Sequence, residues 1–532
     1  MTDKQLLLGD EALALGALHA GLSGVFAYPG TPSTEITEFI QGSALAAERN
    51  VHRDWSCNEK TAMEGALGMS YAGKRALVCF KHVGLNVYAD PFMGSAMTGA
   101  NGGLVIASCD DPSMHSSQNE QDSRFYGAFA MMPVFEPSSQ QEAYEMARAA
   151  FDYSETRGIP VLMRMTTRLS HSRAVVESSE PLREQNPLRY PERPRQWVTL
   201  PVNARVRNRE LIRDYAQFEE DAATASPFNF LREGADHSMG IIACGLAWNY
   251  LMENYPDGCP YPVLKISQYP FPRKLVRTLA SQVRSLLVLE EGQPLVEERL
   301  RGVFDTPIPV HGRLDGTLPR DGELSPDAVR AALGLPAREL YPASEVVAPR
   351  PPALCMGCGH RDFFTALNHV IKDYEGARVF GDIGCYTLGW MPPFRSLHTC
   401  VEMGASVTMA LGAAYSGTYP AVAVIGDSTF THSGMTGLLD AVNGKSDITV
   451  CISDNLTTGM TGGQDSAGTG RLEAICQGLG VEPEHIRTIV PLPKNYPEME
   501  QVIREELEYH GVSVIICRRE CIQTARRHAS QK

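Results

Sequence analysis

The stretch AVAVIGDSTFTHSGMTGLLDAVNGKSDITVCISDNLTTG, residues 421–459, contains two apolar, β-branched segments separated by a helical one. The first predicted strand ends in Gly426–Asp427–Ser428 and the second in Asp454–Asn455. The interval between them fits one strand–helix–strand crossover, which makes the two strands parallel. Both ends then lie at the carboxyl edge of a sheet, where ligands usually bind. The stretch therefore predicts an α/β fold with a ligand site at this edge.

The residue types at this edge suit a magnesium ion and a diphosphate. The Asp427 carboxylate, the Asn455 amide oxygen and a nearby main-chain carbonyl would supply half of an octahedral Mg²⁺ shell, with diphosphate oxygens completing it. Gly426 lets the backbone approach the phosphates, and the N-terminus of the following helix favours anions. A plain turn after a buried strand is the alternative interpretation.

This pattern resembles the thiamine-diphosphate signature, in which GDG is followed after about two dozen residues by N. Ser428 replaces the usual second glycine. The resemblance implies that the third protein ligand of Mg²⁺ is the main-chain oxygen of Thr457. It also calls for a carboxylate in another domain that activates the cofactor's pyrimidine ring. Glu59 fits this role because it follows a predicted strand and opens a helix, although an ordinary first-turn glutamate would look the same.

Two proline-rich stretches, 181–201 and about 319–352, divide the chain. Strands alternate with helical segments on both sides of each stretch, which is typical of parallel sheets covered by helices. We expect three α/β domains at 1–190, 236–318 and 351–532, with linkers at 191–235 and 319–350. The expected strands are 24–28, 51–56, 159–166, 239–244, 262–266, 285–289, 378–380, 421–425, 448–453 and 512–516. Helices are expected to begin near Ser33 and Glu59 and to span 140–157.

The composition excludes several classes of protein. The 532 residues are 43% hydrophobic, enough for several packed cores, and the net charge of −14 argues against a general nucleic-acid binder. No run approaches the roughly 18 apolar residues of a membrane span, and the N-terminus lacks the basic start of a signal peptide. A cytoplasmic enzyme is expected. In that compartment, a pattern within the thirteen cysteines indicates metal or redox chemistry rather than disulfides.

Four cysteines form such a pattern. Cys355 and Cys358 make one C-x-x-C, and Cys385 and Cys521 follow singly, which is not the paired layout of a zinc ribbon. Four thiolates could bind zinc, but an iron–sulfur cluster is more useful beside a carbanion-forming cofactor because it removes electrons singly. Cys517 competes with Cys521 as the fourth ligand. We favour Cys521, since Cys517 lies within a predicted buried strand.

Eight motifs occur in an order that resembles the large subunit of indolepyruvate ferredoxin oxidoreductases, of the 2-oxoacid:ferredoxin oxidoreductase superfamily. They are YPGTPSTE, NEKTAMEGALG, KHVGLNVYADPFM, MHSSQNEQDSRFYG, CMGCGH, GDIGCYTLG, GDSTF and DNLTTGMTGGQ. The resemblance implies a pyrimidine-binding, a transketolase-C-like and a diphosphate-binding domain, in chain order. It implies oxidative decarboxylation of an aromatic 2-oxoacid to its acyl-CoA, with electrons leaving through one [4Fe–4S] cluster.

The resemblance also assigns residues. Glu59 matches the activating glutamate, and Thr31 matches a threonine near the substrate carbonyl. The loop 81–86 is expected to bind the substrate carboxylate, with His82 as a proton donor or as a merely structural histidine. Met460 stands near a position where pyruvate-specific relatives have an asparagine that contacts the substrate carboxylate. An apolar residue there fits a bulkier substrate or a changed role for this position. The remaining expected positions are Asp427, Asn455 and Thr457 for Mg²⁺, Gly426, Ser428 and Gly384 beside the cofactor, and Cys355, Cys358, Cys385 and Cys521 for the cluster.

Several partners are implied as well. We expect a small β subunit, a hetero-oligomer containing an α dimer, CoA as co-substrate, and ferredoxin or another electron-transfer protein. The family usually continues into a ferredoxin-like segment with two C-x-x-C-x-x-C runs, which these 532 residues do not contain, so an external electron relay is expected. The alternatives are an oxidoreductase for another 2-oxoacid, a non-oxidative thiamine-dependent decarboxylase, and a non-catalytic scaffold subunit.

Overall fold

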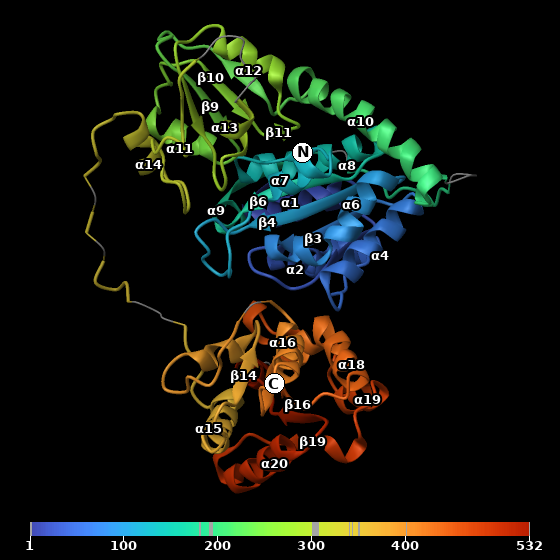
Figure 1. Ribbon diagram of the computed structural model, residues 1–532. Helices are drawn as coiled ribbons and strands as arrows, with labels where there is room; N and C mark the ends of the chain where they lie inside the picture. Colours follow the sequence, from blue (N-terminus) through green and yellow to red (C-terminus); the bar gives the residue numbers. More distant parts are fainter. Residues whose placement is uncertain are drawn as a thin grey trace. The chain divides into compact units, whose positions relative to one another are not determined.

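The computed structural model describes residues 3–179, 182–190, 195–300, 308–339, 341–342, 344–348, 352–400 and 402–530. The chain divides into two compact units, Met1–Tyr341 and Pro342–Lys532 (Figure 1). Each large sheet is parallel except for one edge strand at most, and helices cover both faces. The predicted α/β class with several parallel sheets is confirmed.

The first sheet of the N-terminal unit has the strand order β11-β5-β6-β4-β3-β2, and only β11 is antiparallel to its neighbour. Its strands are β2 Gly24–Ala27, β3 Ala76–Lys81, β4 Leu104–Asp110, β5 Val134–Phe135, β6 Val161–Thr166 and β11 Gln268–Tyr269. Alternate strand residues face opposite sides, as period-2 geometry requires. One side packs on α1 (Gly9–His19) and α8 (Gln140–Arg157), and the other on α4 (Glu59–Tyr71) and α6 (Ala89–Thr98).

The second sheet of this unit has the order β13-β12-β9-β10-β8, with only β8 antiparallel. Its strands are β8 Phe230–Arg232, β9 Gly240–Cys244, β10 Val263–Ile266, β12 Leu286–Leu289 and β13 Val310–His311. The helices α11 (Ala247–Asn254), α12 (Arg273–Ala280) and α13 (Leu295–Leu300) surround it (Figure 1). Strand β11 follows β10 in sequence but joins the first sheet, which explains why both sheets form one unit.

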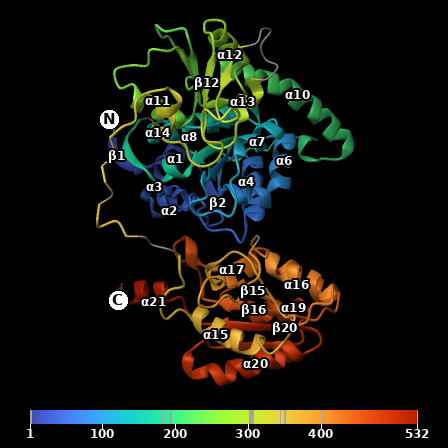
Figure 2. The same ribbon diagram turned by 60° about the vertical axis from the view of Figure 1, so that its left-hand side comes forward.

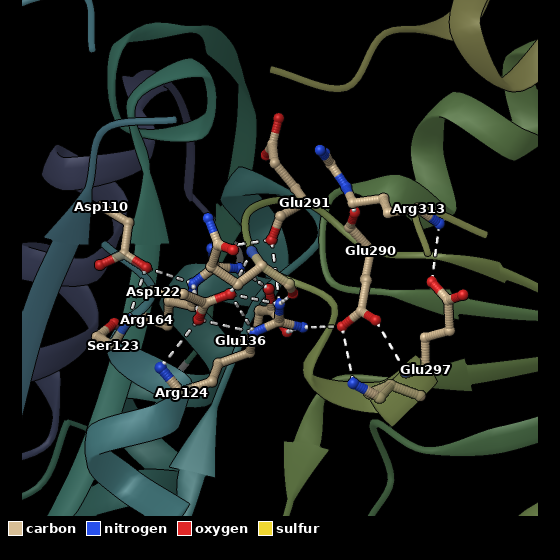
Figure 3. Close-up of polar contacts among 12 residues, drawn as sticks. Asp110, Asp122, Ser123, Arg124, Glu136, Arg164, Glu290, Glu291, Glu297 and Arg313 are labelled. Carbon is tan, nitrogen blue, oxygen red and sulfur yellow. Dashed lines mark hydrogen bonds and ion pairs between the residues drawn. The ribbon is translucent and has the colours of Figure 1, made fainter. Parts of the chain in front are cut away.

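A buried network of charged side chains also links the two sheets (Figure 3). Arg124, on α7 (Ser123–Phe129), contacts Asp122 at 2.5 Å and Glu290 at 3.0 Å. Arg164, on β6, binds Asp110 at 2.6 Å and also pairs with Glu136. Glu290 follows β12 and accepts two backbone N–H bonds from the first turn of α13. The network therefore fixes helix starts as well as the junction between the sheets.

Two expected linkers contain regular structure. The stretch 191–235 holds the 24-residue helix α10 (Pro201–Thr224) and strand β8, so its prediction as a linker was wrong in that part. Proline at the first helical position is compatible with a helix start, and the largely exposed surface of α10 gave little apolar periodicity. The stretch 319–350 contains α14 (Pro326–Ala332), whose Val329 packs into the core beside α11. By contrast, 182–190 does run over the surface as an ordered linker: Gln185 donates to the Leu22 carbonyl at 2.9 Å.

One expected strand is also absent. Residues 51–56 form only two isolated parallel bridges beside β2, through His52 and Trp55. The chain in this region follows the edge of the sheet without extending the ladder. The other expected strands are present, each with ends shifted by no more than two residues. An antiparallel pair, β1 (Asp3–Leu8) and β7 (Arg173–Ser178), packs near α8.

The C-terminal unit contains a wholly parallel sheet with the order β14-β15-β16-β20-β19. Its strands are β14 Arg378–Gly381, β15 Ala421–Gly426, β16 Ile448–Asp454, β19 Ile486–Ile489 and β20 Val512–Arg518. Helices α15 (Gly359–Ile371) and α20 (Tyr496–Glu508) cover one face, and α16 (Ala405–Tyr415), α18 (Met435–Asn443) and α19 (Leu472–Gly478) cover the other (Figure 2). Among the described helices of both units, none combines the length and apolarity needed to cross a bilayer.

Candidate active site

Four adjacent strands of the C-terminal unit deliver the predicted site residues to one edge of their sheet. Asp427 follows β15, Asn455 follows β16, and Cys385 and Cys521 lie in the segments after β14 and β20. Because the strands are parallel and in register, their carboxyl ends lie side by side. Residues more than 130 positions apart in the sequence are thereby brought together.

Asp427 is a buried carboxylate that needs a positive partner. It is 2% exposed, and its Oδ2 has no hydrogen-bond partner among the described residues. Burial raises its pKa to about 7, and the neighbouring Asp454 adds to this effect, while Ser466 opposes it. A buried anion in this state is costly unless it binds a proton or a cation. The orphaned oxygen therefore fits the predicted Mg²⁺ ligand.

Asn455 lies in a short turn between β16 and β17 (Thr457–Thr458). Its side-chain Oδ1 accepts a hydrogen bond from the Thr457 N–H at 3.2 Å, which fixes the amide beside the Thr457 backbone. Ser428, the departure from the glycine of the signature, accepts a hydrogen bond from the Thr458 hydroxyl at 3.1 Å. The serine is thus accommodated by a contact between the two strand ends.

The four predicted cysteines, Cys355, Cys358, Cys385 and Cys521, line one pocket of about 680 Å³, its open mouth included. Burial raises the pKa of Cys385 to about 12, and the other three thiols add to the shift in the order Cys358, Cys521, Cys355. Gly357 turns the C-x-x-C segment through a left-handed conformation, with φ of 80°. Asn455 lines the same pocket, so the thiols lie directly beside the magnesium-type site.

Direct contacts join the thiols to the Asn455 turn. The Cys521 N–H donates to the Asn455 carbonyl at 3.0 Å. A Cβ atom on Gly459 would lie 3.3 Å from Cys385 Sγ and 3.6 Å from Asn455 Nδ2. A side chain at Gly459 would therefore crowd the Cys385 thiol and would touch the Asn455 amide. These contacts couple the position of the cysteine pocket to that of the predicted metal ligand.

Cys517 lies at the base of the same pocket but in a different environment. It is within β20, is 4% exposed and pairs in register with Ser453. Burial raises its pKa well above the usual range, with further contributions from Cys451 and Asp454 rather than from the four pocket thiols. Cys521, in contrast, is half-buried just before α21 (Ile522–Ser530). This environment favours Cys521 over Cys517 as a ligand.

Two residues that the motif reasoning passed over hold the Cys385 loop. Asp382 is fully buried and accepts hydrogen bonds from the Ser406 hydroxyl at 2.6 Å and from Tyr386. The Tyr386 ring packs where a Cβ on Gly384 or Gly426 would collide, at 2.3 and 2.8 Å. Both glycines are thus required by Tyr386 packing as well as by backbone approach. The Gly–Asp pair occurs in both GDIG and GDST, and this repetition is the sequence signal that could have pointed to Asp382.

Glu59 lies in the N-terminal unit, at the first position of α4 as predicted. Asn58 caps this helix by accepting a hydrogen bond from the Thr61 N–H at 2.8 Å. The Glu59 side chain is 7% exposed and packs on Gly84, where a Cβ would meet Glu59 Oε1 at 2.8 Å. Tyr88 is also close, since burial and then the charge of Glu59 raise the Tyr88 pKa. A buried glutamate against a glycine is unlike an ordinary solvated first-turn acid.

A second group of predicted site residues lies at the carboxyl edge of the first sheet of the N-terminal unit. Lys81 ends β3 and donates to the Ser116 carbonyl at 2.6 Å, and the Ser116 hydroxyl donates to the Thr31 carbonyl at 3.4 Å. Burial lowers the pKa of Lys81 to about 8, against the opposing charge of Asp111. The His82 ring is buried, and its Nε2 lies 3.1 Å from the Asn119 carbonyl. This contact fits the structural interpretation of His82, whereas Lys81 is the cation that the loop offers.

Comparisons with known proteins match both units. Residues 15–225 match the pyruvate flavodoxin/ferredoxin oxidoreductase thiamine-diphosphate-binding family, and residues 382–517 match the C-terminal TPP-binding domain of thiamine pyrophosphate enzymes. A 2-oxoglutarate:ferredoxin oxidoreductase from Magnetococcus marinus, solved with 2-oxoglutarate, coenzyme A and succinyl-CoA, aligns over 62% of this chain and 65% of its own, at 14% identity and a TM-score of 0.49.

Curated relatives align over nearly the whole chain. Indolepyruvate oxidoreductase subunit IorA of Archaeoglobus fulgidus is 40% identical over 98% of this chain and 86% of its own length. The subunits of the same name from Methanothermobacter thermautotrophicus and Pyrococcus abyssi are 37% and 36% identical over 98% of this chain, and 87% and 86% of their own lengths. Together with the eight motifs in the sequence, this similarity shows that the chain belongs to the family of indolepyruvate oxidoreductase IorA subunits.

Proposed function

We propose that the chain is the thiamine-diphosphate-binding subunit of an enzyme that oxidatively decarboxylates aromatic 2-oxoacids of the indolepyruvate type to acyl-CoA. The observation that carries the proposal is the single pocket that brings four thiols to the Asn455 turn. A non-oxidative decarboxylase or a scaffold subunit has no need of this arrangement. The names of the relatives support the substrate class and the redox outcome.

The chain's own residues fit the cofactor and its metal. Asp427, the Asn455 amide oxygen and the Thr457 main-chain oxygen would hold Mg²⁺, and Gly426, Ser428 and Gly384 would lie beside the diphosphate. The orphaned Asp427 Oδ2 supports the metal directly. When bound, thiamine diphosphate supplies the nucleophilic carbon that attacks the keto group and accepts the electrons left by carbon dioxide.

Residues of the N-terminal unit would act on the cofactor's pyrimidine ring, through Glu59, and on the substrate, through Lys81. Glu59 is a buried carboxylate in a domain separate from the diphosphate site, as the activation of a pyrimidine ring requires. Lys81 would bind the substrate carboxylate, because it is a half-buried ammonium group at the same sheet edge. Thr31 would lie near the substrate carbonyl, positioned through its contact with Ser116. His82 would position the 81–86 loop.

The four pocket thiols would bind one [4Fe–4S] cluster. Four thiolates could also bind zinc, but an iron–sulfur cluster beside a carbanion-forming cofactor has a use, because it can remove electrons singly. Such a cluster would take up the two electrons of the oxidation one at a time.

The remaining partners follow from this chemistry. A single cluster stores one electron at a time, so an external acceptor, ferredoxin or another electron-transfer protein, must take the two electrons of each turnover. CoA would take the acyl group. The relatives are named as one subunit of their enzyme, which supports a partner β subunit. A hetero-oligomer containing an α dimer is the assembly that we propose. A cytoplasmic location would keep the thiols reduced for cluster assembly.

Iron and sulfide analysis of anaerobically purified protein tests the proposal. We expect about four irons and as many sulfides per chain, as a [4Fe–4S] centre contains. Cys521→Ser should lose most of the iron. Cys517→Ser, the matched control within β20 and four residues before Cys521, should keep it. Zinc in place of iron, or equal loss in both variants, would contradict the cluster assignment.

A further inference from the structure

A second candidate metal site lies within the N-terminal unit, on helices that the proposed reaction does not use. Asp10 on α1, Glu35 on α2 (Thr34–Gly42) and His171 at the end of α9 (Thr167–His171) each offer one ligand atom, and these atoms all lie within 4.8 Å of one another. The Nε2 atom of His171 lies 3.5 Å from the Oε2 atom of Glu35. Three separate segments therefore converge on one point.

Asp10 is the buried base of this site. It is 0% exposed, and neither of its carboxylate oxygens has a hydrogen-bond partner among the described residues. Burial raises its pKa to about 8; Glu35 and Glu11 act in the same direction, and Ser170 and His171 oppose them. No lysine or arginine is among these influences. A fully buried carboxylate with free oxygens requires either a proton or a cation from outside the chain.

The surroundings of Asp10 suit a cation. The buried hydroxyl of Ser170, the residue before His171, also has no partner among the described residues, so it can donate to a ligand or accept from metal-bound water. The Glu35 and His171 side chains are each 34% exposed, which leaves a route from solvent and room for water ligands. Two carboxylates and one imidazole form a mixed O/N donor set, which suits first-row divalent ions better than Ca²⁺.

We propose that Asp10, Glu35 and His171 bind one divalent first-row transition metal ion. The ion ties together α1, α2 and α9. Because α2 begins three residues after Thr31, it also fixes the segment that carries the expected substrate contact. The site uses none of the cofactor or cluster residues, so it stands or falls independently of the proposed reaction.

Manganese(II) is the probe of choice, since it prefers oxygen ligands over the four pocket thiols and is visible by EPR. The experiment uses the full-length chain with Asp427→Ala, which removes the competing magnesium site. We expect one bound Mn²⁺ per chain, with an imidazole nitrogen detected by electron spin-echo modulation. Asp10→Asn and His171→Gln should each weaken binding at least tenfold. His311→Gln is the matched control, because His311 Nδ1 lies 2.7 Å from Asp315 Oδ2 on the surface, and the two form no three-ligand group with another described residue.

Circular dichroism shows whether each variant is folded. Because the His171 side chain is about one-third exposed, the His171→Gln variant keeps the test valid even if the buried Asp10→Asn variant is unstable. Loss of the nitrogen coupling and of one Mn²⁺ equivalent in His171→Gln supports the site. Mn²⁺ binding that is absent, or that is unchanged in His171→Gln, would show that Asp10 is neutralised by a proton and would overturn the proposal.

Discussion

Asp122 and Asp427 are both buried aspartates at the start of a helix, but their surroundings differ. Asp122 accepts hydrogen bonds from Arg124 and lies near Arg164, so although burial acts to raise its pKa, the two arginines lower it to about 2 (Figure 3). Among the described residues, no lysine or arginine pairs with Asp427, and burial raises its pKa to about 7. The protein provides the counter-charge of Asp122 through its own arginines, whereas the counter-charge of Asp427 has to come from a bound ligand.

This difference distinguishes charged side chains that hold the fold together from charged side chains that bind ligands. The arginines around Asp122 join the two sheets of the N-terminal unit and offset the charges of the carboxylates that they contact. A buried charge without its partner is instead typical of a binding or catalytic site. By this criterion we expect Asp427 to mark the cofactor site. Lys81, whose pKa burial lowers to about 8, is the cation that we expect at the substrate edge.

The largest effect is expected from Asp427→Ala. The variant should lose thiamine diphosphate binding almost completely, by roughly a thousandfold or about 4 kcal/mol, because the diphosphate and Mg²⁺ bind together. Isothermal titration calorimetry with Mg²⁺ present measures this. Asp122→Asn, which removes a charge from the structural network, should leave cofactor affinity unchanged once the protein is folded. Similar losses in both variants would break the distinction between the two aspartates.

Arg124→Met should produce the next effect, a loss of stability. It leaves Asp122 and Glu290 buried without their partner, and breaking a buried ion pair costs about 3–5 kcal/mol. Native-state hydrogen exchange in β4 and β9, on either side of the network, reports the loss as faster exchange. Arg213→Met, at an exposed pair with Asp214 on α10, is the control and should change exchange little. A stable Arg124→Met protein would mean that the network is not structural.

A smaller, pH-dependent effect is expected at Lys81. A depressed pKa means that the folded protein loses this proton near pH 8, below the usual range. Lys81 therefore weakens folding below about pH 8, and this cost disappears as pH rises toward the unfolded pKa of about 10.4. Binding of the substrate carboxylate should instead weaken as pH rises, because Lys81 loses its charge. KM should rise up to tenfold for each pH unit above 8. Lys81→Arg, which stays charged, should flatten the dependence of KM on pH. A flat wild-type profile would exclude Lys81 from substrate binding.

The sequence alone predicted the residues that sit in short, regular motifs. The ends of β15 and β16, the start of α4 at Glu59 and the four pocket cysteines all follow from strand-to-helix junctions or from cysteine spacing, which are local signals. The fold class followed from the alternation of strands and helices. These features depend on neighbours in the chain, so they can be read without coordinates.

The parts that could not be predicted depend on distant partners. Arg124 and Glu290 are far apart in sequence, and nothing in either segment indicates their contact. The Cys521 hydrogen bond to the Asn455 carbonyl likewise exists only because β16 and β20 are adjacent. Helix α10 was missed because its stability comes from a few contacts, such as buried Leu211 and Phe218, rather than from a strong apolar stripe.

The most direct test of the central claim is whether an aromatic 2-oxoacid reduces the cysteine-bound cluster of this protein. Anaerobic, oxidised protein with Mg²⁺ and thiamine diphosphate is mixed with indolepyruvate, and cluster absorbance and EPR are followed over one turnover. We predict rapid bleaching and a reduced-cluster signal in the wild type, and bleaching slowed by orders of magnitude in Glu59→Gln, which retains its iron and binds the cofactor. Decarboxylation of indolepyruvate while the cluster stays oxidised would contradict the claim that the four thiols and the Asp427 site form one redox centre.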